Sequence, residues 1–247
     1  MSDVILAIMK NFTRRDFLKS TAFTGAALSL NALTWARAAG ANEDIRVAQI
    51  GFRGQGSGHI STLRRLKGVR VVALCDVDQR VLSRKAEELG GGVKTYTDVR
   101  KLLEDKEIDA VSIATPNHWH ALGTIWACQA GKDVYVEKPA SHNIFEGRKM
   151  VEAARKYKRI VQCGMQCRSS VGLQEAVEYV RSGKLGKIVL ARGFCYKGRK
   201  SIGMVDGPQT VPDYIDYNLW CGPAPDAPPR RNGSNGPVHY DWHWFWD

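Results

Sequence analysis

The sequence predicts a doubly wound α/β fold, in which helices cover a mostly parallel sheet. Short β-branched runs alternate with amphipathic segments from residue 45 to about residue 165, and parallel strands need such crossover segments. A glycine-rich turn follows the first run, and an acidic residue, Asp76, follows the second. After Tyr196 the chain is rich in Gly, Pro, Asn and aromatic residues with little periodicity, which is typical of a long loop or of an incomplete domain.

The expected elements follow one another in regular order. We expect strands at 45–51, 69–75, 93–97, 110–115, 133–138 and 159–164, and helices at 59–67, 79–89, 99–106, 118–131 and 145–158. A further helix at 171–181 and a strand at 187–196 begin a second, α+β domain with an antiparallel sheet. We therefore expect domains at 44–165 and 166–247, the second of them partial.

The N-terminal residues have the pattern of a targeting signal. Residues 13–19 read Thr-Arg-Arg-Asp-Phe-Leu-Lys, and a weakly apolar run ending in Ala36-Arg37-Ala38 follows them. This combination is typical of a twin-arginine signal peptide, so we expect residues 1–38 to direct export through the Tat machinery, to the periplasm or beyond. The run is too short and too rich in Ser and Thr for a stable membrane span. A basic amphipathic helix of the fold is the alternative.

Composition excludes several classes of protein. With 44% hydrophobic and 25% charged residues, the chain has the composition of a globular protein. The formal charge is +11, but Lys and Arg alternate with acids and form no basic stripe interleaved with aromatics, so we expect no nucleic-acid partner. The six cysteines form no CxxC pair, and we expect mostly buried thiols and no metal site.

The glycine-rich turn and the acid after the second strand predict a dinucleotide site. Glycines in a turn that opens a helix let the backbone approach a pyrophosphate. Asp76 lies 20 residues after the last turn glycine, the spacing expected of an acid that binds the adenosine ribose hydroxyls and repels a 2′-phosphate. NAD is therefore favoured, although Arg80 keeps NADP open; a glycine turn of a non-nucleotide α/β fold is the alternative. The turn residues expected to bind the cofactor are Gly51, Phe52, Arg53, Gly54, Gln55 and Gly56.

Two further motifs follow the fourth and fifth strands. Residues 115–120 read Thr-Pro-Asn-His-Trp-His, and residues 137–139 read Glu-Lys-Pro. With the glycine turn in register, these motifs resemble the Gfo/Idh/MocA oxidoreductases closely over about residues 45–195. The resemblance implies an NAD(P)-binding Rossmann domain at 44–165.

The resemblance also implies roles for individual residues. Lys138 would be the catalytic lysine that orients the substrate hydroxyl and assists its proton transfer, Glu137 would lie near the nicotinamide ribose, and a cis bond at Pro139 is expected. His118 and Trp119 are expected to pack the start of a helix, and a surface lysine at a strand end is the alternative for Lys138. The other residues expected to bind the cofactor are Thr115, Pro116, Asn117, His120, Glu137, Lys138 and Gln166.

The implied activity is hydride transfer between nicotinamide and a hydroxyl of a sugar or polyol. Because the Tat route carries folded proteins, we expect a tightly bound cofactor that is loaded before export. The family's later acid and histidine, and the rest of its second sheet, have no match in this sequence. We therefore expect the chain alone to bind dinucleotide but not to complete the catalytic site. A homo-oligomer is expected of the full-length form. An NAD-dependent glycosidase and a non-catalytic dinucleotide-binding fragment are the alternatives, and the intact Glu-Lys-Pro motif favours the oxidoreductase.

Overall fold

The computed structural model describes residues 44–195, 198, 206–229 and 238. The chain divides into two compact units, Met1–Asp44 and Ile45–Asp247, and the description below concerns the second unit. The expected signal peptide at 1–38 lies outside the described residues. Among the helices of the described ranges, none is both long and apolar enough to cross a membrane.

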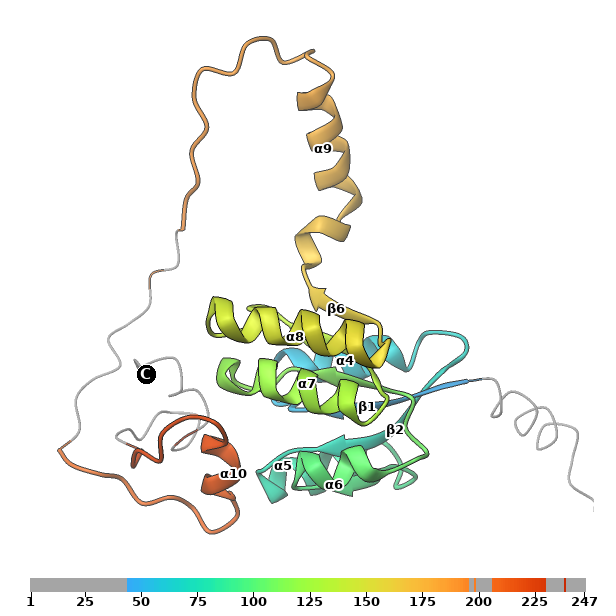
Figure 1. Cartoon of the computed structure of the whole chain (residues 1–247), viewed down its shortest axis with the longest axis vertical. Coiled ribbons are helices and arrows are strands. Elements are labelled where there is room, and N and C mark those ends of the chain that lie inside the picture. The colour runs from blue at the N-terminus through green and yellow to red at the C-terminus, as the bar shows by residue number, and fades with distance from the viewer. Residues whose placement is uncertain (1–43, 196–197, 199–205, 230–237, 239–247) are drawn as a thin grey trace, which may run out of the picture. The chain divides into compact units, whose positions relative to one another are not determined.

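A six-stranded parallel sheet forms the centre of the second unit, which confirms the predicted fold class (Figure 1). Its order, β3-β2-β1-β4-β5-β6, reverses direction between β1 and β4, so the carboxyl ends of these strands form the topological switch point where α/β sheets bind ligands. The strands are β1 (Ile45–Ile50), β2 (Val69–Cys75), β3 (Lys94–Tyr96), β4 (Ala110–Ile113), β5 (Asp133–Glu137) and β6 (Val161–Gly164).

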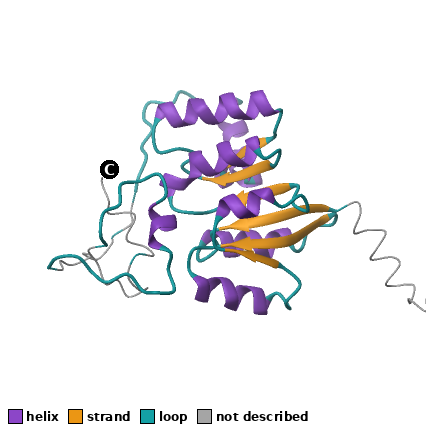
Figure 2. Cartoon of the chain, turned by 60° about the horizontal axis from the view of Figure 1, so that its bottom comes forward, coloured by secondary structure: helices purple, strands orange, loops and turns teal. Residues whose placement is uncertain are grey.

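Helices lie on both faces of the sheet (Figure 2). One apolar cluster joins Ile60 and Val81, from the two helices that follow β1 and β2, to Leu74. The other cluster joins the helices that follow β3, β4 and β5 to the opposite face through side chains such as Leu102 and Met150. The helices are α4 (Gln55–Leu63), α5 (Gln79–Glu88), α6 (Val99–Glu104), α7 (His120–Gln129), α8 (Ile144–Tyr157), α9 (Val171–Arg181) and α10 (Tyr217–Cys221), with 3-10 turns η1 (Asn117–Trp119) and η2 (Gln166–Ser169).

Two expectations about individual elements were wrong, and one helix was missed. The first helix begins at Gln55, four residues earlier than predicted, because the glycine turn itself forms its first turn. The expected strand at 187–196 is not formed over its described residues 187–195, which are exposed and have no strand beside them to complete backbone hydrogen bonds. The short helix α10 was not predicted; Asp216 caps it by accepting a hydrogen bond from Leu219 N (2.9 Å).

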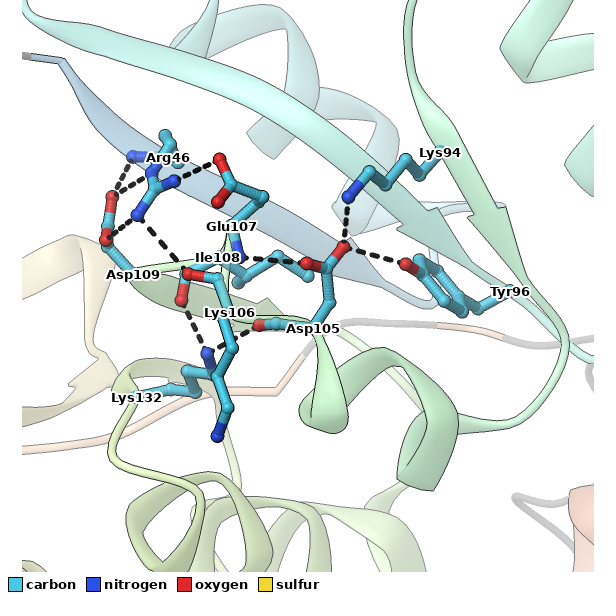
Figure 3. A network of polar contacts seen from close by, with 9 residues as sticks. All are labelled: Arg46, Lys94, Tyr96, Asp105, Lys106, Glu107, Ile108, Asp109 and Lys132. Atoms are coloured by element: carbon cyan, nitrogen blue, oxygen red, sulfur yellow. Dashed lines mark hydrogen bonds and ion pairs between the residues drawn. The ribbon is translucent and has the colours of Figure 1, made fainter. Parts of the chain in front are cut away.

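A polar network braces the connection that leads into β4, at the sheet end opposite the switch point (Figure 3). Arg46, in β1, donates to both carboxylate oxygens of Asp109. The buried Lys132 donates through Nζ to Asp105 O and Ile108 O, at 2.7 Å each. Because buried carbonyls need hydrogen-bond partners, this lysine is a structural residue of the 105–109 connection.

Candidate dinucleotide site

A pocket of about 660 Å³ lies at the carboxyl ends of β1, β2, β4 and β5. Two of the predicted cofactor-binding residues, Gly56 and Gln166, are not part of its lining. The structure brings all the others together in it: Gly51, Phe52, Arg53, Gly54, Gln55, Asp76, Thr115, Pro116, Asn117, His120, Glu137 and Lys138. The three motifs are far apart in the sequence, but each follows a strand of the same parallel sheet, so the fold brings them to one edge.

The glycine turn has its shape because of close backbone contacts. Gly51 has a φ of +70°, and a Cβ there would lie 2.9 Å from Ala114 O. A Cβ at Gly56 would overlap Gly51 O and lie 2.8 Å from the side-chain nitrogen of the buried Gln49, which itself donates to Gly51 O at 2.9 Å. The absence of a side chain at Gly56 therefore allows the turn to pack closely on Gln49, outside the pocket lining. At Gly54 a Cβ would meet no atom of the described residues within 4 Å apart from its chain neighbours, so the backbone facing the pocket is open to a phosphate.

Asp76 connects this turn to the end of β2. Its Oδ2 accepts a hydrogen bond from Phe52 N (3.4 Å), and its Oδ1 accepts one from Asp78 N (3.0 Å). Loss of water around the carboxyl raises its pKa to about 6, although both backbone donors oppose this shift. A carboxylate held by backbone donors at the pocket wall can accept hydrogen bonds from the hydroxyls of a ribose.

The motifs after β4 and β5 are joined by His120. Its side chain is buried, with Nε2 2.9 Å from Thr115 O and Nδ1 2.6 Å from Pro139 O. The Lys138–Pro139 peptide is cis, as predicted. The Thr115 hydroxyl oxygen is buried at the pocket and has no hydrogen-bond partner among the described residues. An unpaired hydroxyl, an open glycine backbone and the Asp76 carboxylate form a set of groups that fits a dinucleotide.

Glu137 is held by polar groups from three directions. Its Oε1 accepts a hydrogen bond from Gln166 Nε2 (2.6 Å) and lies 3.1 Å from His59 Nε2, and its Oε2 accepts one from Lys138 N (3.2 Å). Gln166 therefore reaches the site through Glu137, and its role in binding stays a prediction. Sequence reasoning missed His59; its place in α4, one helical turn after the glycine turn, was the available signal.

A C-terminal segment, residues 211–222, closes one side of the pocket and was not predicted. Its Ile215 forms an antiparallel bridge with Asp78, and its Leu219 and Trp220 line the pocket. His118 and Trp119 had been expected only to pack the start of a helix, but both also contact this segment. His118 Nε2 lies 2.8 Å from Trp220 O, and Trp119 Nε1 donates to Leu219 O at 3.0 Å. We name residues 211–222 the pocket strap.

The family model for oxidoreductases with an NAD-binding Rossmann fold matches residues 45–165. Residues 45–165 of this chain belong to the Gfo/Idh/MocA oxidoreductase family. The matched residues contain the glycine turn, the acid after β2 and both later motifs. The NAD-binding Rossmann domain predicted from the motifs is thereby confirmed.

Several known proteins resemble the chain. Glycosyl hydrolase family 109 protein 2 of Shewanella sp. (strain ANA-3) is 32% identical over 208 residues, covering 73% of this chain and 45% of the relative. Inositol 2-dehydrogenase of Salmonella typhimurium (strain LT2) is 28% identical over 172 residues, covering 69% and 48%. The crystal structure of myo-inositol 2-dehydrogenase from Lactobacillus plantarum has a TM-score of 0.55 and 32% identity over 59% of this chain and 43% of that one. The chain spans about half the length of the curated relatives it matches.

In this chain, docking of the pocket strap is expected to weaken in acid. Burial lowers the pKa of His118, and its bond to Trp220 O opposes this only in part. Release of the strap restores a more ordinary pKa of His118, so protonation of this ring favours release. The contribution of His118 to the free energy of strap docking is therefore complete above about pH 6.5 and is lost as the pH falls below that value. The cause is the burial of a charged ring, not the loss of the hydrogen bond to Trp220 O, because the protonated ring can still donate to that carbonyl oxygen.

Acrylamide quenching of tryptophan fluorescence between pH 7.5 and 5.5 measures this release. Quenching should increase toward pH 5.5 in the natural chain, and His118→Gln should remove most of that change. The same pH dependence in both proteins would refute the role of His118.

Proposed function

We propose that this chain is the dinucleotide-binding part of an NAD-dependent oxidoreductase that transfers hydride between nicotinamide and a secondary hydroxyl of a sugar or cyclitol. The observation that carries the proposal is a single pocket that unites the glycine turn, Asp76 and the Glu137–Lys138 pair. The relatives named as inositol 2-dehydrogenases support the substrate class. A WlbA dehydrogenase from Chromobacterium violaceum, solved with NADH and UDP-GlcNAcA, is 26% identical to the matched part with a TM-score of 0.54, which supports the cofactor.

The chain's own residues would bind and orient the reactants. When bound, nicotinamide supplies the hydride chemistry. Asp76 would accept hydrogen bonds from ribose hydroxyls, and the open backbone at Gly54 would bind the phosphates. Lys138 lines the same pocket, so its ammonium can donate to the substrate oxygen, stabilise negative charge on it and exchange its proton.

An NAD-dependent glycosidase is the second candidate, because the relatives named glycosyl hydrolase family 109 include one that is 32% identical over 208 residues. Two assays separate the candidates. Formation of NADH with myo-inositol or a hexose supports the oxidoreductase, whereas release of nitrophenol from a chromogenic glycoside without net NADH supports the glycosidase. Binding without either reaction would leave a non-catalytic dinucleotide-binding protein.

Lys138→Ala is expected to lower the rate of NADH formation at least about 100-fold, equivalent to about 2.7 kcal/mol of transition-state stabilisation. NAD affinity should change little, because Asp76 and the glycine turn stay intact. Lys149→Ala, which removes a lysine that pairs with Glu152 on helix α8, is the matched control and should leave the rate unchanged. An undiminished rate in Lys138→Ala would exclude this lysine as the proton-transfer group.

We also propose that residues 1–38 export the folded, NAD-loaded protein through the Tat machinery. Arg14 and Arg15 in the sequence Thr-Arg-Arg-Asp-Phe-Leu-Lys support this proposal. Replacing both by Lys keeps the charge, and it should retain the protein in the cytoplasmic fraction of a fractionated bacterial host. Equal export of both proteins would contradict the proposal. A homo-oligomer of the full-length form stays a prediction.

A further inference from the structure

A chain of polar side chains runs behind the pocket wall and joins four separate elements. Ser112 of β4 lies 3.0 Å from His59 Nδ1 of α4, and His59 Nε2 lies 3.1 Å from Glu137 Oε1 at the end of β5. Gln166 of η2 donates to the same oxygen at 2.6 Å. Glu137 lines the pocket, whereas His59 and Ser112 do not. His59 can therefore influence a ligand in the pocket through Glu137.

The partners of His59 decide which of its nitrogens carries the hydrogen. A carboxylate oxygen only accepts hydrogen bonds, so Nε2–H donates to Glu137, and in the neutral ring Nδ1 then accepts from the Ser112 hydroxyl. The side chains of His59 and Glu137 are only 12% and 6% exposed. The ring also contacts Tyr135 edge-on, with centroids 5.2 Å apart. Both the ring orientation and its tautomer are thereby fixed.

The two oxygens of Glu137 are used differently. Oε1 accepts from both His59 and Gln166, which fills its usual capacity of two hydrogen bonds. For Oε2 the described residues supply one donor, Lys138 N at 3.2 Å. Gly164 makes room for this arrangement, since a Cβ there would lie 2.9 Å from Oε1. Oε2 therefore keeps acceptor capacity for a hydroxyl in the pocket.

We infer that His59 is a positioning residue that orients the Glu137 carboxylate. In this orientation Oε2 accepts a hydrogen bond from a hydroxyl group of the nicotinamide half of the dinucleotide. This inference rests on the proposed function. It also connects the two halves of the site, because His59 belongs to α4, whose first turn forms the phosphate turn, while Glu137 directly precedes Lys138. A change in α4 is transmitted to the Glu137–Lys138 pair through one hydrogen bond.

Three variants and two ligands test this role by calorimetric titration. ADP carries the adenosine and phosphates but lacks nicotinamide and its ribose, so it reports the phosphate turn and Asp76 without Glu137. His59→Phe removes both nitrogens and should weaken NAD about tenfold, but ADP less than about twofold. His59→Gln, which keeps an amide donor for Glu137, should restore NAD affinity to within about threefold of the natural chain. Ser112→Ala should weaken NAD more than ADP, because it removes the hydrogen bond that helps to orient the His59 ring toward Glu137.

The outcomes are distinguishable. Equal weakening of NAD and ADP in His59→Phe, or no change in either, would overturn the inference, and so would failure of His59→Gln to restore NAD affinity. If His59→Phe does not fold in a thermal melt, His59→Gln and Ser112→Ala decide by the same comparison of NAD with ADP. Absence of NAD binding by the natural chain would instead refute the proposed function.

Discussion

Gly56→Ala is expected to abolish NAD binding and to destabilise the folded chain. The added Cβ would overlap Gly51 O and lie 2.8 Å from Gln49 Nε2, and Gln49 is completely buried beneath the turn. Neither group can move away without breaking the hydrogen bond between them. We expect a loss of about 3 kcal/mol in the free energy of unfolding, typical of overpacking at a rigid site, and a fall in NAD affinity of at least about 100-fold.

Gly58→Ala is the matched control for this substitution. Gly58 belongs to the same helix, α4, and within the described part of the chain a Cβ there would meet no atom within 4 Å apart from its chain neighbours and the helix's own backbone. Because alanine favours helices more than glycine does, this variant should be equally stable or more stable by up to about 1 kcal/mol. Chemical denaturation and NAD titration of both variants check the prediction. Normal NAD affinity in Gly56→Ala would show that the close contacts beneath the turn are unimportant.

Asp76→Asn is expected to have opposite effects on binding and on stability. Asparagine keeps one acceptor oxygen but lacks the negative charge and the second acceptor oxygen of the carboxylate, so hydrogen bonds from ribose hydroxyls become weaker. NAD affinity should therefore fall about tenfold or more, while NADP should lose less because the repulsive charge is gone. NAD should thus lose much of its advantage over NADP. Glu87→Gln on α5 is the control, since it removes a surface acid outside the pocket lining.

The stability of the ligand-free chain follows from the raised pKa of Asp76, about 6 against an ordinary value of 3.8. The folded state holds this proton more tightly than the unfolded state, so the contribution of Asp76 to stability is complete below about pH 3.8 and is lost as the pH rises to about 6. At 1.36 kcal/mol per pKa unit the loss is on the order of 2 to 3 kcal/mol. Asp76→Asn should therefore be more stable than the natural chain at pH 7.5, and this difference should shrink toward pH 4 in urea denaturation. A constant difference across that range would contradict the origin of the effect.

Local sequence patterns were sufficient for residues 45–165. Each strand and helix there has its own apolar periodicity, and the glycine turn and Asp76 lie at the ends of strands that a parallel sheet must bring to one edge. The same reasoning could not find contacts between residues distant in sequence. The hydrogen bonds of Trp119 with the pocket strap join residues 100 positions apart, and no local pattern predicts them.

The strand expected at 187–196 failed for a related physical reason. Its apolar residues, such as Val189, favour a strand, but a strand forms only when a neighbour completes its backbone hydrogen bonds. Sequence reasoning missed His59 because its role depends on Glu137, which lies 78 residues later in the chain. Only the folded sheet brings Glu137 Oε1 to 3.1 Å from His59 Nε2.

Equilibrium titration of the purified chain with NAD, after removal of any nucleotide carried through purification, tests the central claim most directly. The account predicts one NAD bound per chain, tighter binding of NAD than of NADP, and a large loss in Gly56→Ala but not in Gly58→Ala. A chain that is folded by its thermal melt and yet binds neither NAD nor NADP would contradict the account.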